Sequence, residues 1–97
     1  MNKKSFFKVS ILMTFFNEEK YIKRSLKSLI NQSFRNWEAV IIDDCSTDNS
    51  AGIIKKFKDQ RIKYFKLQKH KGRTSALNFG LQKCKGRFIS ILDADDF

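Results

Sequence analysis

Three carboxylates stand together near the end of this chain, in the run Asp93-Ala94-Asp95-Asp96. The apolar run Phe88-Ile89-Ser90-Ile91-Leu92 comes directly before them. A short apolar run of this kind is typical of a buried strand in a parallel sheet. Ligands of open α/β sheets bind just beyond the carboxyl ends of the strands. Oxygen ligands at that place suit a hard divalent cation, which can hold the phosphates of a substrate. The run therefore predicts a binding site for such a cation.

Polar residues also follow two other predicted strands. Asp43 and Asp44 come at the end of the apolar run that starts at Trp37, and Thr14 lies in the run from Val9 to Phe16. The carboxyl ends of parallel strands meet at one edge of a sheet, so we expect the three stretches to gather along one rim. Three separate stretches that reach one rim favour a binding site there more strongly than any single stretch does.

Each of these residues also has a plain structural interpretation. The acids at 93–96 can form a solvated turn or cap a helix, and Asp43 and Asp44 can cap a turn, as aspartate often does. Thr14 fits an ordinary strand position, and Phe16 fits an ordinary core aromatic. On spacing alone, the structural and the functional interpretations both stay open.

A basic loop, Gln68-Lys69-His70-Lys71-Gly72-Arg73, is expected opposite the carboxylates. Arg73 can attract phosphate there, whereas the two lysines are better explained as parts of a mobile surface loop. His70 is interpreted as an exposed loop residue and not as a metal ligand, because no second His or Cys lies at metal-ligand spacing.

The elements that must position these residues alternate between strand and helix. This alternation predicts an α/β fold of three layers, in the order β-α-β-α-β-α-β, with a mainly parallel sheet and crossover helices. The first strand should be central, and the third, which is more polar, should lie nearer an edge. Strands are expected at 9–16, 37–43, 61–67 and from 88 on, and helices from a cap at Asn17 to about Gln32, at 49–58 and at 74–84.

The composition bounds the domain organisation. A chain of 97 residues with 41% hydrophobic residues can build one small domain, which we assign to 1–97. It has no proline and only four glycines, so no linker is expected. Cys45 and Cys84 form no metal-ligand pair, and without a secretory signal they indicate reduced, packed thiols and a cytoplasmic location. No apolar run approaches the length of a membrane span.

Five stretches, in order along the chain, resemble the N-terminal, nucleotide-binding part of the family 2 glycosyltransferases, which have the GT-A fold. The resemblance covers the chain from Val9 to Phe97, and it implies that the predicted sheet is the Rossmann-like half of that fold. The stretches are Val-Ser-Ile-Leu-Met-Thr-Phe-Phe-Asn-Glu-Glu, Ser-Leu-Ile-Asn-Gln-Ser-Phe, Ile-Ile-Asp-Asp-Cys-Ser-Thr-Asp, Gly-Arg-Thr-Ser-Ala-Leu-Asn-Phe-Gly-Leu and Lys-Gly-Arg-Phe-Ile-Ser-Ile-Leu-Asp-Ala-Asp-Asp.

The resemblance implies a nucleotide-sugar donor, most often a UDP-sugar, and a divalent metal, Mn²⁺ or Mg²⁺. Thr14 and Phe16 would lie at the uracil pocket, with Phe16 stacked on the base, and Asp44 would accept the base N3–H. Asp93 and Asp95 match an Asp-x-Asp motif whose acids meet the ribose and, through the metal, the diphosphate. The full set implied for nucleotide-sugar binding is Thr14, Phe16, Glu18, Asp44, Arg73, Asp93 and Asp95, with Asp95 and Asp96 as metal ligands.

The chain departs from the family pattern in two ways. A proline and a tyrosine are common where this chain has Thr14 and Phe16. Loss of the tyrosine hydroxyl removes one hydrogen bond but keeps the stacking face. The family's catalytic base lies well downstream of the Asp-x-Asp motif, so no residue here is assigned as catalytic. We therefore expect a chain truncated after that motif, inactive alone.

The resemblance also sets expectations about partners. The sugar, lipid or polysaccharide acceptor would bind through the missing C-terminal part. The parent enzyme would contribute to polysaccharide biosynthesis and associate peripherally with the inner face of a membrane. A homodimer through an unpaired sheet edge is an open expectation.

Two other function classes compete with this interpretation. The net charge of +10 favours anionic partners, and a basic nucleic-acid-binding α/β domain is one alternative. The acids at the predicted site argue against nucleic acid, since they repel phosphate when no metal is bound. A nucleotidyltransferase-like domain would show a glycine-rich and basic loop after the first strand, where this chain has Phe15-Phe16-Asn17-Glu18.

Overall fold

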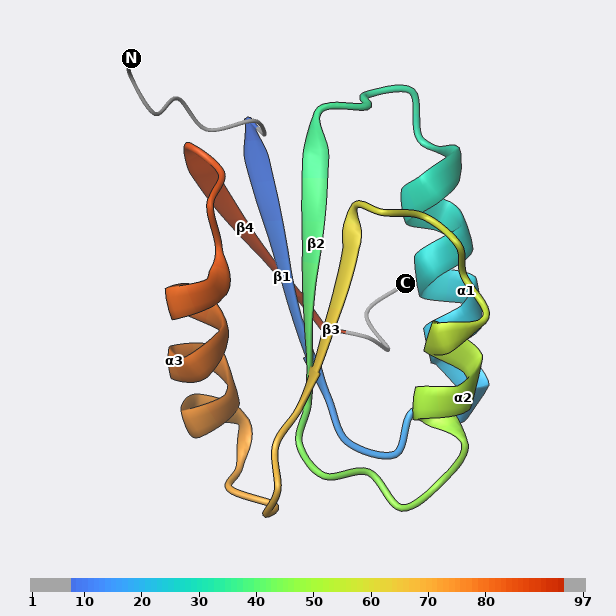
Figure 1. Cartoon of the computed structure of the whole chain (residues 1–97), viewed down its shortest axis with the longest axis vertical. Helices are drawn as coiled ribbons and strands as arrows, with labels where there is room; N and C mark the ends of the chain where they lie inside the picture. Colours follow the sequence, from blue (N-terminus) through green and yellow to red (C-terminus); the bar gives the residue numbers. More distant parts are fainter. Residues whose placement is uncertain (1–7, 94–97) are drawn as a thin grey trace.

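The predicted alternation of strands and helices is confirmed in the computed structural model, which describes residues 8–93. Over these residues, four strands and three helices alternate (Figure 1). Their bounds are β1 Val9–Phe15, α1 Glu19–Asn31, β2 Trp37–Asp43, α2 Ser50–Lys55, β3 Ile62–Lys66, α3 Arg73–Lys83 and β4 Phe88–Asp93.

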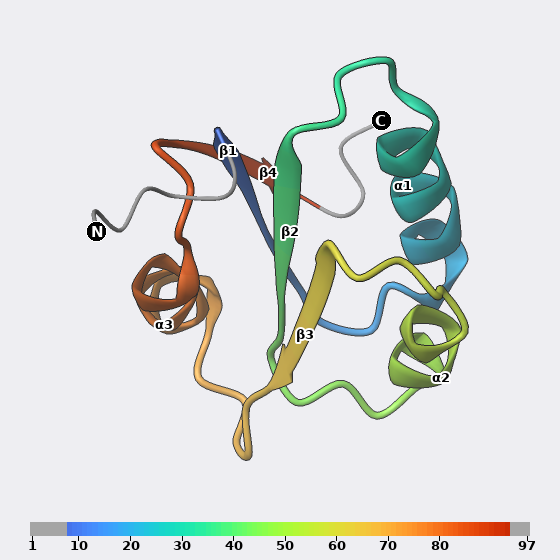
Figure 2. The same ribbon diagram turned by 45° about the horizontal axis from the view of Figure 1, so that its top comes forward.

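The four strands form one parallel sheet in the order β3-β2-β1-β4. β1 is central and β3 lies at an edge, as expected. Figures 1 and 2 show α1 and α2 on one face of the sheet and α3 on the other, so the fold has three layers. The register pairs Phe15 with Asp43 and Thr14 with Asp93, which brings three polar strand ends to one edge of the sheet.

The side chains of the two central strands divide between two apolar clusters, because successive strand residues face opposite sides. Ile11 and Met13 pack against α1, and Leu12 packs against α3 together with Ala76. Every residue of β2 is buried, which explains why this strand reads as an almost continuous apolar run.

The start of α1 differs from the prediction. Asn17 is not its N-cap: α1 begins at Glu19, and Asn17 has a left-handed backbone with φ 53°. The Asn17 Oδ1 accepts instead the backbone N–H groups of Thr47 and Asp48, at 2.7 and 3.2 Å. Asparagine tolerates this conformation better than most residues, so Asn17 ties the β1–α1 loop to the β2–α2 loop.

The N-termini of α1 and α2 satisfy each other's backbone groups. The Asp48 carboxylate accepts the N–H of Glu19 at 3.1 Å and the N–H of Ser50 at 3.0 Å. In the other direction, the Glu19 carboxylate accepts the N–H of Asn49 at 3.0 Å. Asp48 therefore accepts the first N–H of α2, although Asn49 holds the N-cap position. The helix itself is shorter than predicted and ends at Lys55 instead of Lys58.

A buried polar network holds the opposite end of the sheet, near the start of β1 and β2. Glu38 is fully buried and accepts hydrogen bonds from the Ser10 hydroxyl, the Lys85 backbone N–H and the Lys63 ammonium, at 2.5, 2.6 and 2.9 Å. The Gly86 N–H donates to the Ser10 Oγ. A Cβ at Gly86 would lie 2.5 Å from the Ser10 backbone nitrogen, so only glycine fits there.

The apolar run of β4 is not buried among the described residues, contrary to the expectation. Phe88, Ile89 and Ile91 are about half exposed, at 58%, 46% and 50%. The reason is that β4 lies at the sheet edge and α3 packs on β1 and β2. Over the described part of the chain, no helix is long and apolar enough to cross a membrane.

Candidate nucleotide-sugar site

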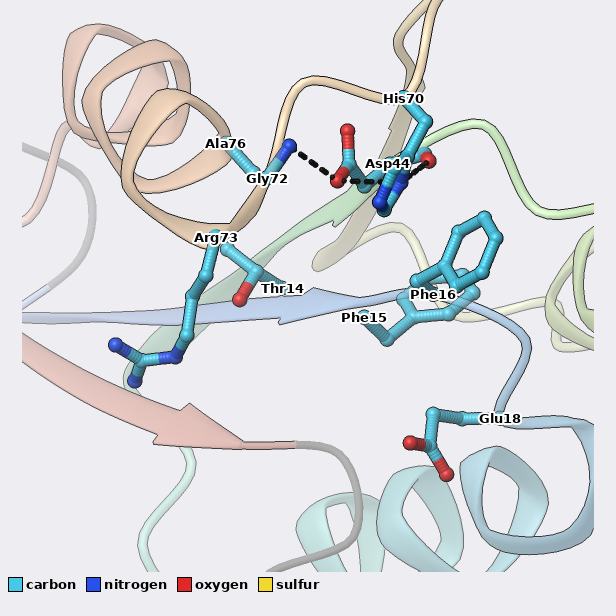
Figure 3. A pocket seen from close by; sticks show the side chains of 9 residues that line it. All are labelled: Thr14, Phe15, Phe16, Glu18, Asp44, His70, Gly72, Arg73 and Ala76. Carbon is cyan, nitrogen blue, oxygen red and sulfur yellow. Dashed lines mark hydrogen bonds and ion pairs between the residues drawn. The ribbon is translucent and has the colours of Figure 1, made fainter.

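A pocket of about 390 Å³ opens at the carboxyl ends of β1 and β2. Parallel strands present this edge for ligand binding, and the start of α3 closes the pocket from one side. Figure 3 shows how its lining residues converge from β1, β2, α3 and the loops beside them. The lining residues are Thr14, Phe15, Phe16, Glu18, Asp44, His70, Gly72, Arg73 and Ala76.

Five residues of the predicted set line this one pocket, although they are distant in sequence. The set is Thr14, Phe16, Glu18, Asp44 and Arg73. Convergence of this kind is what the parallel order of the strands requires, because β1 and β2 end side by side. Their individual roles toward a ligand stay predictions.

Asp44 is buried in the pocket wall and holds the loop before α3 by hydrogen bonds. It is 3% exposed, and its two carboxylate oxygens accept the backbone N–H groups of Lys71 and Gly72, each at 2.8 Å. The His70 Nδ1 lies 2.9 Å from the Asp44 Oδ2 and 3.1 Å from its backbone oxygen (Figure 3). Asp44 therefore fixes the loop before α3 as well as lining the pocket.

Phe16 is not a core aromatic, since 40% of it is exposed at the pocket. The His70 ring lies against it, with centroids 4.2 Å apart and planes tilted by 47° (Figure 3). His70 is exposed, as expected of a loop residue, but it contacts both Phe16 and Asp44. The sequence pattern did not assign His70 to the site. The signal that could have done so is its place in the short loop that leads into Gly72 and Arg73.

Gly72, Phe15 and Ala76 also line the pocket and were not predicted as site residues. Gly72 has φ 92°, a backbone conformation that favours glycine, and it lets the chain turn from the basic loop into α3. Arg73 is the first residue of α3. Figure 3 shows its side chain extending from the helix past Thr14. A helix N-terminus and a guanidinium together give this side of the pocket a positive potential.

Asp43 has a structural role. It is fully buried, and its carboxylate accepts the Ser46 N–H at 2.7 Å and the Tyr64 hydroxyl at 2.6 Å. Burial and the hydrogen bond to Asp43 raise the pKa of Tyr64, so this hydroxyl stays a donor. Both acids of the pair thus hold loops in place, and only Asp44 lines the pocket.

Of the three acids in the Asp-x-Asp run, only Asp93 lies within the described residues. Asp93 ends β4, where it pairs with Thr14 in the strand register. Asp95 and Asp96 lie outside the described residues, and the predictions for them stand untested. Within 8–93, no group of three His, Cys, Asp or Glu side chains could hold a metal ion.

The two thiols are free. Cys45 and Cys84 are both partly buried, and Cys84 packs beside the apolar cluster under α3. Burial raises the pKa of the Cys84 thiol, and the nearby Glu38 charge acts in the same direction. The position of Cys84 agrees with the expected packing role, whereas the Cys45 Sγ donates to the Gln68 backbone oxygen at 3.6 Å.

The family model described as Glycosyl transferase family 2 matches residues 10–97. The chain therefore belongs to this family, and the resemblance carried by the five stretches is confirmed.

Two relatives illustrate the match. An uncharacterized glycosyltransferase of Haemophilus influenzae is 43% identical over 91 residues, which cover 92% of this chain and 36% of that protein. The Escherichia coli enzyme named UDP-Glc:alpha-D-GlcNAc-diphosphoundecaprenol beta-1,3-glucosyltransferase WfgD is 41% identical, over 91% of this chain and 35% of its own length. The chain thus spans about a third of these relatives.

A solved structure shares the fold closely. S. aureus TarS 1-349, crystallised in complex with UDP-GlcNAc, superposes with a TM-score of 0.87 and 34% identity. The alignment covers 91% of this chain and 26% of the TarS chain. The three-layer fold described above, a parallel sheet with helices on both faces, is therefore part of a GT-A glycosyltransferase domain.

Proposed function

We propose that this chain is the donor-binding part of a glycosyltransferase that takes a nucleotide sugar, namely a UDP-sugar, for inverting transfer to an acceptor hydroxyl. The observation that carries the proposal is the convergence of Phe16, Asp44 and Arg73 on one pocket at the carboxyl edge of a parallel sheet. The E. coli relative is named for a UDP-Glc donor, and TarS was crystallised with UDP-GlcNAc.

The base would bind against Phe16 and Asp44, beside the His70 ring that contacts both of them. The exposed ring of Phe16 offers an aromatic surface, on which a nucleobase can stack. An ionised carboxylate has about four acceptor positions, and Asp44 uses two of them for the backbone N–H groups of Lys71 and Gly72. Acceptor capacity therefore remains for the N3–H of uracil, which is the hydrogen bond that we propose for Asp44.

The diphosphate would lie toward the start of α3. Arg73 and the helix N-terminus supply positive charge on that side of the pocket. Asp93 and Asp95 are proposed to meet the ribose and the metal-bound diphosphate, with Asp95 and Asp96 as ligands of Mn²⁺ or Mg²⁺. When bound, such a cation stabilises the negative charge that develops on the leaving diphosphate.

Calorimetric titration of the chain with UDP, with and without Mn²⁺, tests the donor site. We expect UDP to bind more tightly with Mn²⁺, and the variant Asp95→Ala to bind UDP without any response to the metal. ADP is the matched control, because it carries the same diphosphate with a different base. If UDP does not bind under either condition, the donor-site proposal is wrong. If Asp95→Ala keeps the full response to Mn²⁺, the metal assignment alone is wrong.

The acceptor and the catalytic base are proposed to belong to a longer protein, since relatives are about three times the length of the matching segment. The E. coli relative is named for a diphosphoundecaprenol-linked acceptor. By analogy, we propose a lipid-linked or polysaccharide acceptor at the cytoplasmic side of a membrane. For the 97-residue chain alone, we expect donor binding without sugar transfer.

A further inference from the structure

We propose that the outer face of α1 is a docking surface for a membrane that contains anionic lipids. Four exposed cationic side chains recur along this helix and are called here the α1 cationic stripe: Lys20, Lys23, Arg24 and Lys27. Spacings of three and four residues bring side chains to the same side of a helix. The four charges therefore form one row, opposite the buried residues Ile22, Leu26 and Leu29.

Over the described part of the chain, the stripe has no ion-pair partner. Within residues 8–93, none of its four side chains has a carboxylate at ion-pair distance. Glu19, the acid of the first turn, is directed to the Asn49 N–H of the neighbouring helix. Like charges three or four residues apart repel each other and weaken a helix. A negatively charged surface would compensate the four positive charges and so reduce this repulsion more than water does.

An apolar groove beside the stripe favours a membrane over a nucleic acid. The groove has a volume of about 330 Å³ and lies between α1 and α2. Ile53 and Phe57 contribute apolar surface, and Lys23, Lys27 and Lys56 surround it. Lysine stems can lie along such a surface while their ammonium groups reach lipid phosphates. Apolar surface surrounded by lysines suits the membrane boundary, where acyl chains lie next to charged headgroups. The backbone of a nucleic acid has the charges but no comparable apolar layer.

Two exposed aromatic side chains lie near the two ends of α1. Tyr21 lies in the first turn of α1 and Phe34 lies shortly after its last turn, and each is 43% exposed. Aromatic rings of this kind partition well into the headgroup region. Figures 1 and 2 show α1 on the side of the sheet opposite α3, which lines the donor pocket. Docking through α1 would therefore leave the α3 side of the pocket accessible.

Vesicle sedimentation tests the proposal directly. The 97-residue chain is mixed with vesicles in which one lipid in three is phosphatidylglycerol and the rest are phosphatidylcholine. Vesicles of pure phosphatidylcholine serve as the reference. We expect binding to the anionic vesicles only, and its loss as NaCl is raised to about 0.5 M, because salt screens exposed charges.

The decisive comparison is between two variants of equal net charge. Lys23→Glu/Lys27→Glu reverses two charges of the stripe, and Lys66→Glu/Lys69→Glu reverses two exposed charges elsewhere. One lysine near an anionic surface changes the partition coefficient by about fivefold, so the stripe variant should lose at least about twentyfold. The control should lose less than about fivefold. On α1 the stripe variant makes the 20/23 and 24/27 pairs attractive, makes the 19/23 pair repulsive and leaves the 23/27 pair repulsive, so these changes roughly cancel and we expect a Tm close to that of the wild type. Circular dichroism of both variants, before the vesicle assay, checks that each is folded.

Three results would overturn the proposal. Absence of binding to anionic vesicles at low salt is the first. Equal losses in the two variants would show that total charge, and not the stripe, is responsible. Stripe-dependent binding to duplex RNA without vesicle binding would assign the surface to nucleic acid. None of these results bears on UDP binding, so the donor-site proposal would stand or fall separately.

Discussion

The carboxylate of Asp44, at the end of β2, accepts the backbone N–H of Gly72 at 2.8 Å, although 28 residues separate them in sequence. With the Lys71 N–H on the other oxygen, this contact holds the loop before α3 against the sheet. The side chain proposed to read the base is thus also the anchor of the pocket wall.

Replacement of Asp44 by Asn should therefore affect both stability and binding. The amide can accept from only one of the two N–H groups, and the other is left without a partner in a buried place. We expect a loss of about 1–3 kcal/mol in the free energy of unfolding. For a domain of this size, that is a fall in Tm of roughly 4 °C or more. UDP binding, measured well below both melting temperatures, should be lost. An unchanged Tm would contradict the anchoring role.

Phe16→Leu tests stacking without opening a core cavity, because Phe16 is partly exposed. Base–aromatic stacking contributes about 1–3 kcal/mol, so the dissociation constant of UDP should rise at least about fivefold. Phe34→Leu is a matched control, since Phe34 is exposed to a similar extent (43% against 40%) and does not line the pocket. Calorimetry on the two variants makes the comparison. Equal effects of the two substitutions would rule out a stacking role for Phe16.

His70→Ala should weaken UDP binding, because the imidazole forms part of the pocket wall between Phe16 and Asp44. We expect a smaller effect than that of Phe16→Leu. His70→Gln is a useful companion, as it can keep a donor toward Asp44 without the ring. Tighter binding of UDP to His70→Ala would show instead that the imidazole competes with the base for these partners.

Glu38 predicts a pH dependence of stability that is separate from the pocket. Burial by itself raises the pKa of this carboxyl, but hydrogen bonds from Ser10, the Lys85 backbone and Lys63 outweigh it and hold the pKa below its ordinary value. A depressed pKa means that the ionised form stabilises the fold above the unfolded-state pKa of about 4.5. This contribution is lost as the pH falls through the lower pKa of the folded state.

Urea unfolding of the wild type and of Glu38→Gln, from neutral pH downward, checks this expectation. The variant should be less stable by about 1–3 kcal/mol at neutral pH, and the difference should shrink below about pH 4.5. Asp48 and Asp59 also have lowered pKa values, but they are present in both proteins and cancel in the difference. A difference that is independent of pH would contradict the role given to the Glu38 charge.

The strand and helix order could be predicted from the sequence because apolar runs and helical spacing repeat clearly along it. The position of β1 at the centre followed from its low polarity, and the clustering of Thr14 with Asp44 followed from the parallel order. These are consequences of periodicity and topology, which a single sequence carries.

Contacts between distant loops could not be predicted in the same way. Asn17 is of a residue type that is common at helix N-caps, yet its side chain accepts hydrogen bonds from Thr47 and Asp48, about thirty residues away. His70 has no metal partner in sequence, yet the Asp44 contact brings it onto Phe16. Likewise, the apolar run of β4 predicted burial, but only the packing of α3 on β1 and β2 decides how much of it is covered.

The shared cap of α1 and α2 has a consequence for how this part of the molecule opens. Asp48 binds N–H groups of both helices, and Glu19 returns a bond to Asn49. Fraying at either N-terminus therefore removes acceptors from the other helix. The two helices should exchange their first amide hydrogens with solvent as one cooperative unit, and the floor of the donor pocket at Glu18 should lose its order in the same event.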